Sequence, residues 1–265
     1  MPSTHAVSLS ALAFEVADIA RRAGAVIMDI YRDEASFEVE HKADDSPLTR
    51  ADKASNAVIV TALEQLDFQA PIISEENKQI AFEERATFTY CWMVDPLDGT
   101  KEFIKRNGEF TVNIALIHDG RVVMGVVYVP VTAELYWASA DGGAFKSSQG
   151  NVSNLQAATF SMSDPHLAVV ASRSHLNEAT SSFIGGLQKP ELVSVGSSLK
   201  LLLVAEGRAH LYPRLAPTME WDTAAAQIIV EEAGGQVLQA DNNEPVVYNK
   251  ENLLNPHFIV SGKRV

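Results

Sequence analysis

The chain has 265 residues, 46% of them hydrophobic and 21% charged, which is typical of a globular protein with one or two closely packed domains. Its formal net charge of −13 argues against polymeric nucleic acid as a partner, because duplex binding depends on many Lys and Arg contacts. The longest apolar run, residues 122–131, is too short to cross a bilayer, so we expect no transmembrane segment. The single cysteine, Cys91, excludes an internal disulfide and is typical of a cytoplasmic protein.

Hydrophobic spacing predicts the elements of the first half in chain order. These are a long helix over 9–32, a strand at 36–41, a second helix over 51–66, short buried strands at 71–74 and 88–94, and an antiparallel meander over 112–137.

The second half alternates between strands and helices. The pattern predicts strands at 167–171, 192–195, 209–212, 237–238 and 257–260, helices at 174–187, 198–206 and 223–233, and a loop at 213–220. A polar stretch near residues 150–165 separates the two halves. We therefore expect a layered α+β protein with an N-terminal half, 1–155, packed tightly against a C-terminal half, 156–265.

The most informative segment is residues 92–103, where an apolar strand ends at two carboxylates, Asp95 and Asp98. The proline between them stiffens the turn, and Gly99 permits backbone angles that other residues resist. Both carboxylates and the Leu97 carbonyl can then face one point. Hard oxygen ligands of this kind suit Mg²⁺, although the same segment alone is about as typical of an ordinary surface turn.

Three further carboxylates lie at the edges of predicted elements. Glu75 follows the strand at 71–74, Asp222 precedes the last long helix, and Asp52 lies on the second helix. Taken singly, Asp222 is more typical of a helix N-cap than of a metal ligand. Asp52 taken singly is as typical of a helix surface as of a functional site. Taken together, acids at separate strand ends are better explained by convergence on a cation, because clustered carboxylates without one repel one another. Such a cation also allows an acidic protein to bind an anionic substrate.

Thr100 starts a predicted helical turn directly after Gly99. Amide groups at a helix start bind phosphate oxygens, and a hydroxyl there can hold a water molecule. Asp52 could orient this hydroxyl and accept its proton.

These residues lie in motifs that resemble the inositol monophosphatase superfamily. The motifs are Asp-Pro-Leu-Asp-Gly-Thr at 95–100 and Trp-Asp-Thr-Ala-Ala-Ala at 221–226, the latter continuing to the glycine pair 234–235. Within it the chain is most similar to the bacterial 3′(2′),5′-bisphosphate nucleotidases, over almost its whole length. That branch is matched by residues 42–52, 100–113, 172–175, 196–200 and 211–214. Thr-Lys-Glu-Phe at 100–103 replaces the Thr-x-Asn-Phe of inositol phosphatases; Ala226 departs from the glycine found in many of the nucleotidases.

The resemblance implies an α/β/α/β/α sandwich and a lithium-sensitive phosphomonoesterase with two or three Mg²⁺ ions. It implies that the metal ligands are Glu75, Asp95, the Leu97 carbonyl, Asp98 and Asp222. Asp52 and Thr100 would activate water, and the substrate would contact Gly99, Thr100, Ser197, Lys200, Arg214 and His175. Without the resemblance, Lys200 and Arg214 read as solvated residues and His175 as part of a first helical turn.

The function implied by the resemblance is hydrolysis of adenosine 3′,5′-bisphosphate to AMP and phosphate in sulfur assimilation, with 3′-phosphoadenylyl sulfate as a further substrate. Two alternatives stay open. One is the same chemistry on an inositol or sugar phosphate, and the other is a non-catalytic nucleotide or metal sensor. The location implied is cytoplasmic, and the resemblance leaves open a peripheral contact with the inner membrane. The sequence does not fix the oligomeric state.

Overall fold

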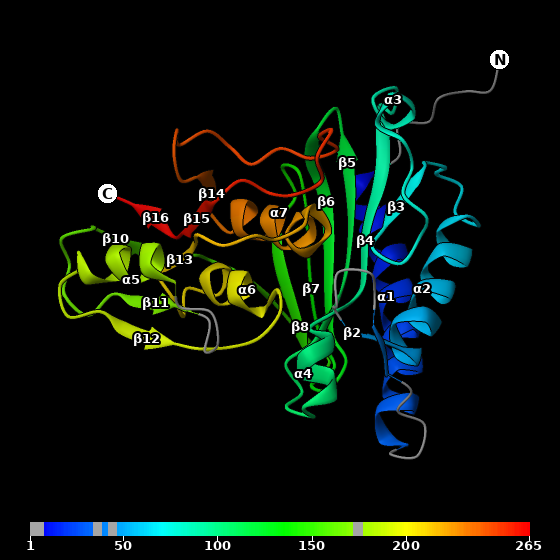
Figure 1. Cartoon of the computed structure of the whole chain (residues 1–265), viewed down its shortest axis with the longest axis horizontal. Helices are drawn as coiled ribbons and strands as arrows, with labels where there is room; N and C mark the ends of the chain where they lie inside the picture. Colours follow the sequence, from blue (N-terminus) through cyan, green and yellow to red (C-terminus); the bar gives the residue numbers. More distant parts are fainter. Residues whose placement is uncertain (1–7, 34–38, 42–46, 172–176) are drawn as a thin grey trace.

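The computed structural model describes residues 8–33, 39–41, 47–171 and 177–265 and arranges them in five layers (Figure 1). The described helices are α1 (Leu9–Arg32), α2 (Arg50–Leu63), α3 (Phe82–Arg85), α4 (Thr100–Ile104), α5 (Glu178–Gly185), α6 (Leu199–Ala205) and α7 (Ala224–Glu232), with the 3-10 turn η2 (Glu220–Asp222) before α7.

A seven-stranded sheet forms the first β layer, with the order β3-β4-β5-β6-β7-β8-β9. Its strands are β3 (Ile72–Ser74), β4 (Tyr90–Asp98), β5 (Thr111–His118), β6 (Arg121–Val129), β7 (Glu134–Ser139), β8 (Gly143–Ser148) and β9 (Asn151–Asn154). Only β3 and β4 pair in parallel; the other neighbours in this sheet are antiparallel.

A five-stranded sheet forms the second β layer, with the order β12-β11-β13-β15-β14. Its strands are β11 (Ala168–Val170), β12 (Glu191–Val193), β13 (Leu211–Arg214), β14 (Gln236–Gln239) and β15 (Phe258–Ser261). Two small ribbons pair β1 (Val39–His41) with β2 (Pro47–Thr49), and β10 (Thr159–Phe160) with β16 (Lys263–Arg264).

The helices complete the layers because each buries an apolar stripe. On α1, Leu12, Val16, Ile19, Ala23 and Ile27 are buried at helical spacing and face the seven-stranded sheet. α2 packs beside α1 on the same face, α6 and α7 lie between the two sheets, and α5 covers the far side of the second sheet (Figure 1). The α+β sandwich predicted from the sequence is therefore confirmed.

The main differences from the predicted elements lie in polar or short segments. β8, β9, β10, β16 and α3 were not predicted; the Ser and Asn residues of β8 and β9 have low β-propensity and read as loop. The second helix ends at Leu63 rather than at 66. The predicted loop at 213–220 starts later, because Pro213 and Arg214 extend β13 by pairing with β15. Residues 36–38 of the first predicted strand and the start of the helix at 174 lie outside the described residues.

The change from one sheet to the other falls between β9 and β11, close to the predicted boundary at 155. α7 nevertheless belongs to the second half and packs on β5 and β6 of the first. The division into halves 1–155 and 156–265 stays a prediction. Among the described helices, none combines the length and the apolar character that crossing a membrane requires.

Candidate functional site

Three carboxylates from separate parts of the chain converge at the carboxyl ends of β3 and β4. Ser74 and Val94 are partners in the parallel pair, and the Glu75 amide donates to the Val94 carbonyl at 3.1 Å, so that Glu75 and Asp95 lie at the same edge of the sheet. Asp95 is still inside β4, which runs on to Asp98 rather than ending at 94 as predicted. Asp222 reaches this edge from η2. One carboxylate oxygen each of Glu75, Asp95 and Asp222 lies within 4.8 Å of the other two.

The turn after Asp95 is shaped by an irregularity in the β4–β5 ladder. Asp95 is paired with Asn113 and Asp98 with Thr111, so the register shifts between them. The Leu97 amide donates to Asp95 Oδ1 at 3.0 Å, and the Ser198 amide donates to Asp98 Oδ2 at 2.5 Å. Asp98 therefore lies beside the three-carboxylate cluster but is held by α6.

Gly99 closes this turn in the left-handed region, with φ +97°. A side chain there would also meet the Glu109 carbonyl oxygen at 3.0 Å. Only glycine fits both conditions, and Gly99 therefore lets the chain turn from the end of β4 into α4, which starts at Thr100.

Burial and the repulsion of neighbouring charges raise the pKa values of Asp95, Asp98 and Asp222. Burial raises the pKa of Asp95 well above its ordinary value, and the charges of Glu75, Asp98 and Asp222 raise it further. Burial, and then the charge of Asp98, raise the pKa of Asp222 to about 8. Burial raises the pKa of Asp98 to about 6, opposed by Lys200. Carboxylate oxygens whose repulsion a cation would relieve are a fitting donor set for a hard divalent metal ion.

These pKa shifts predict how stability depends on pH. The folded pKa values of Asp98 and Asp222, about 6 and about 8, exceed the ordinary value of 3.8, so the metal-free folded state binds more protons than the unfolded state. Its melting temperature should therefore fall as pH rises from about 5 to about 8. Added MgCl₂ should raise the melting temperature more at pH 8 than at pH 5, because metal and protons compete for these oxygens. Thermal melts in EDTA and in MgCl₂ at each pH check this. A rise in melting temperature on adding MgCl₂ that is the same at pH 5 and pH 8 would contradict it.

Asp52 and Thr100 form a second feature of the site. Asp52 is only 2% exposed, which rules out the surface interpretation. Its Oδ2 accepts from the Thr49 amide at 2.8 Å and from Thr49 Oγ1 at 2.5 Å, so it caps α2. Its Oδ1 accepts from Thr100 Oγ1 at 3.1 Å. Burial raises the pKa of Asp52, and the hydrogen bonds from Thr49 and Thr100 oppose this shift.

A cavity of about 180 Å³ adjoins the acids and is lined by both halves of the chain. Its lining contains the predicted residues Asp98, Gly99, Ser197, Lys200, Arg214 and Asp222. Burial lowers the pKa of Lys200, opposed chiefly by Asp98. Arg214 Nη2 donates to the Pro217 carbonyl at 2.7 Å, whereas its Nε is buried without a partner among the described residues. Lys200 and Arg214 therefore belong to the cavity and are not ordinary solvated residues.

The loop that carries Ser197 approaches α4 closely. A Cβ atom at Gly196 would lie 2.6 Å from Glu102 Cγ and 2.9 Å from the Glu109 carbonyl oxygen. The Gly196 amide donates to Glu109 Oε2 at 2.8 Å, and Ser197 follows with a positive φ of 48°. This packing brings the start of α6, and with it Lys200, to the acidic turn.

The N-cap interpretation of Asp222 is wrong for α7, because Thr223 holds that position. The Asp222 side chain instead accepts from the Met219 amide at 2.9 Å, which fixes it within η2. His175 lies outside the described residues, and its role stays a prediction.

Several further residues line the cavity and were missed by the sequence reasoning. They are Lys101, Glu102, Ser198, Leu201, Tyr212, Thr218, Thr223 and Phe258. Lys101 and Ser198 could have been found, since both stand inside the motifs that carry the resemblance. Glu102, Tyr212 and Thr223 also stand inside those motifs, whereas Leu201, Thr218 and Phe258 carry no such local signal.

Comparison with known proteins agrees with this geometry. Residues 9–263 match the model of the Inositol monophosphatase family. The chain belongs to that family. It is 45% identical to the 3′(2′),5′-bisphosphate nucleotidase CysQ of Salmonella typhimurium over 247 residues, which cover 93% of this chain and 98% of the relative. The CysQ protein of Escherichia coli K12 is 44% identical over 248 residues, with the same coverage.

A solved structure gives the same result. The crystal structure of CysQ from Bacteroides thetaiotaomicron, described as a bacterial member of the inositol monophosphatase family, superposes with a TM-score of 0.85 at 46% sequence identity. The match covers 96% of this chain and 98% of that chain. The family resemblance predicted from the motifs is therefore confirmed.

Proposed function

We propose that this protein is a divalent-metal-dependent 3′(2′),5′-bisphosphate nucleotidase that hydrolyses adenosine 3′,5′-bisphosphate to AMP and phosphate. The observation that carries the proposal is the joining of two features in one place. Asp222, a member of the acidic cluster, and its neighbour Asp98 line the same cavity as Lys200 and Arg214. The acids, with bound metal, suit the phosphate that is removed. Lys200 and Arg214 suit the phosphate that stays on the nucleotide. The similarity to CysQ nucleotidases supports the same substrate class.

The residues that would hold the metal are Glu75, Asp95, Asp98, Asp222 and the Leu97 carbonyl. Their oxygens suit Mg²⁺, and we propose two or three ions. When bound, such ions lower the pKa of a water molecule and neutralise charge on the phosphoryl group.

The protein supplies the proton acceptor and the orientation. Thr100 Oγ1 donates its proton to Asp52 Oδ1, so its lone pairs are free to accept a hydrogen bond from the attacking water. As that water attacks phosphorus, its proton passes to Thr100 Oγ1 while the threonine proton passes to Asp52. The raised pKa of Asp52 suits this role, because a base works best when its pKa lies near the working pH.

Substrate recognition follows from the walls of the cavity. We propose that the amides of Gly99 and Thr100 contact the phosphate that is removed. Ser197, Lys200 and Arg214 would bind the second phosphate, with His175 near the nucleoside. A polyol phosphate has no second phosphate for the side chains of Lys200 and Arg214 to bind, which favours a bisphosphate over inositol 1-phosphate as the substrate.

Turnover of adenosine 3′,5′-bisphosphate should therefore exceed turnover of inositol 1-phosphate, and Lys200→Met should reduce this preference. We expect kcat/KM for the bisphosphate to fall about a hundredfold, since a buried charge-assisted contact to phosphate is lost, with little change for inositol 1-phosphate. Lys263→Met, at an exposed strand near the C-terminus, is the control and should change neither value.

Phosphate release from both substrates measures this. Faster turnover of inositol 1-phosphate would favour the alternative function on polyol phosphates, and no turnover of either with bound Mg²⁺ would favour a sensor. Hydrolysis of 3′-phosphoadenylyl sulfate, lithium sensitivity and a cytoplasmic location stay predictions.

A further inference from the structure

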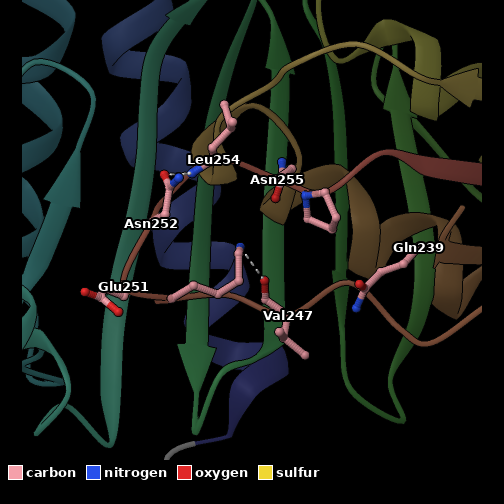
Figure 2. A pocket seen from close by; sticks show the side chains of 8 residues that line it. Gln239, Val247, Glu251, Asn252, Leu254 and Asn255 are labelled. Atoms are coloured by element: carbon pink, nitrogen blue, oxygen red, sulfur yellow. Dashed lines mark hydrogen bonds between the residues drawn. The ribbon is translucent and has the colours of Figure 1, made fainter. Parts of the chain in front are cut away.

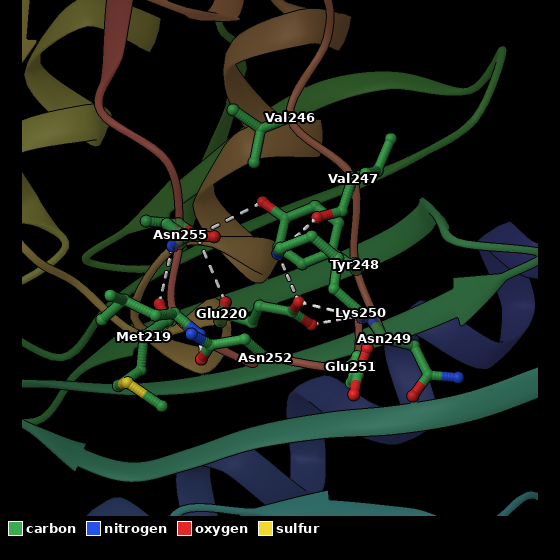
Figure 3. A network of polar contacts seen from close by, with 12 residues as sticks. Met219, Glu220, Val246, Val247, Tyr248, Asn249, Lys250, Glu251, Asn252 and Asn255 are labelled. Atoms are coloured by element: carbon green, nitrogen blue, oxygen red, sulfur yellow. Dashed lines mark hydrogen bonds and ion pairs between the residues drawn. The ribbon is translucent and has the colours of Figure 1, made fainter. Parts of the chain in front are cut away.

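Residues 247–255, here called the strap, run across the turn η2 that carries Asp222 (Figure 3). The Glu220 amide donates to the Leu253 carbonyl at 2.9 Å, and the Asn255 amide donates to the Thr218 carbonyl at 2.8 Å. Met219 and Leu254 form an isolated antiparallel bridge. The turn is therefore fastened to the strap on its main chain, although about 30 residues separate the two in sequence.

Glu220 fastens the strap a second time, through its side chain. It is fully buried, two residues before Asp222. Its carboxylate accepts from the Asn249 amide at 2.5 Å and from the Lys250 amide at 3.2 Å, and it forms an ion pair with Lys250 Nζ (Figure 3). Three donors from the strap thus compensate the cost of burying the Glu220 carboxylate. Removing one partner of a buried ion pair leaves the other charge uncompensated and is strongly destabilising.

Asn255 holds the turn from its other side. Its Nδ2 donates to the Met219 carbonyl at 2.8 Å and to Thr223 Oγ1 at 2.9 Å. These two acceptors come before and after Asp222 in the chain. The backbone that presents the Asp222 carboxylate is therefore clamped on both flanks by one amide group.

Arg85 connects the strap to the first half of the protein. Its side chain is buried, and its Nη1 donates to Asn249 Oδ1 at 2.8 Å and to the Lys250 carbonyl at 2.9 Å. Asn249 Nδ2 returns a bond to the Arg85 carbonyl at 2.8 Å. Arg85 belongs to α3, in the connection between β3 and β4 whose ends present Glu75 and Asp95. The strap thus touches the elements that bring acids from both halves to one cluster.

The hollow on the outer side of the strap does not account for the position of Lys250. This hollow has a volume of about 720 Å³ and is lined by residues of the strap together with Gln239 and Pro256 (Figure 2). Lys250 is the lysine among the residues that line this hollow. Its Nζ already donates to the Val247 carbonyl at 2.9 Å and pairs with Glu220. The ammonium group of Lys250 therefore points to the turn rather than to a ligand in the hollow.

We propose that the strap positions Asp222 for metal binding, with Glu220, Lys250, Asn255 and Arg85 as positioning residues that touch neither substrate nor metal. The inference rests on the metal site of the proposed function. Residues that orient a metal ligand from behind it commonly change metal affinity by about 10- to 100-fold when replaced.

Lys250→Met tests this, because it removes the ion pair but keeps the apolar stem of the side chain. Titration calorimetry with MgCl₂, without substrate, should show metal binding about tenfold weaker than in the wild type. The metal concentration for half-maximal turnover should rise by the same factor, while KM for the nucleotide at saturating metal stays unchanged. Lys250→Arg, which keeps the charge, should recover most of the affinity. Asn255→Ala, made separately, should weaken metal binding in the same direction through an independent contact.

Lys146→Met is the matched control. Lys146 is a half-buried lysine that pairs with Glu134 and Glu206 at 2.7 Å each, at the opposite end of α6 from Lys200. Its loss should lower the melting temperature but leave metal affinity unchanged. Wild-type Mg²⁺ affinity in both Lys250→Met and Asn255→Ala would overturn the inference but not the proposed function. The same would follow if Lys146→Met weakened Mg²⁺ binding as much as Lys250→Met does. A wild-type protein that binds no Mg²⁺ would overturn the proposed function, and the inference with it.

Discussion

Asp95→Asn should lower kcat about a thousandfold or more, and the same change should make the metal-free protein more stable. The loss corresponds to about 4 kcal/mol of transition-state stabilisation, which is within what a bound divalent ion contributes. Stability should rise because Asp95 is buried among Glu75, Asp98 and Asp222, whose charges all disfavour its ionisation. An asparagine has the same shape and still accepts from the Leu97 amide, so the turn should keep its conformation.

Phosphate release at saturating MgCl₂ and thermal melts in EDTA at pH 8 measure the two effects. Asp164→Asn is the control, because Asp164 also accepts from a backbone amide, that of Ser161 at 2.8 Å, in a turn outside the site. It should change neither value. An Asp95→Asn protein that keeps more than about a tenth of wild-type kcat would show that this carboxylate does not take part in a metal site.

Thr100→Ala should lower kcat about a hundredfold or more without weakening Mg²⁺ binding, since general acid–base steps contribute about 10²–10⁴ in rate. The substitution removes the hydroxyl that connects water to Asp52 and leaves all the carboxylates in place. Thr100→Ser keeps the hydroxyl and should recover most of the rate. Asp52 is a less suitable single test because it also caps α2 through Thr49, so that its loss affects folding as well as chemistry.

A double-variant cycle separates the two roles. If Asp52 and Thr100 work as one proton path, Asp52→Asn should add little to the loss already caused by Thr100→Ala. Rate constants from single-turnover experiments with metal in excess measure this. Fully additive losses, or a Thr100→Ala protein with wild-type kcat, would contradict the proposed path.

The acidic cluster could be predicted because its members stand at the ends of strongly patterned elements. Glu75 and Asp95 follow apolar strands, and parallel strands bring such ends to one edge. Asp222 taken singly is more typical of a helix N-cap, and only its combination with the other acids indicated that it converges with them on a cation.

The positions that could not be predicted depend on contacts between distant segments. Glu220 ends the predicted loop at 213–220, and in the structure it is fully buried where Lys250 and the strap fold back over it. The pairing of Asp52 with Thr100 was predicted, but Asp52 alone is equally typical of a helix surface, and its bond to Thr49 was not predicted. β8 and β9 were missed because their polar residues are paired at the edge of a sheet whose other strands carry the core.

We propose that acids from both halves of the chain meet to hold a divalent cation. Anomalous diffraction from crystals soaked in MnCl₂ tests it most directly, since Mn²⁺ takes the same oxygen ligands as Mg²⁺. We expect an anomalous peak between the carboxylates of Glu75, Asp95 and Asp222, of which one oxygen each lies within 4.8 Å of the other two. Side chains that point apart, with no peak between them, would contradict it.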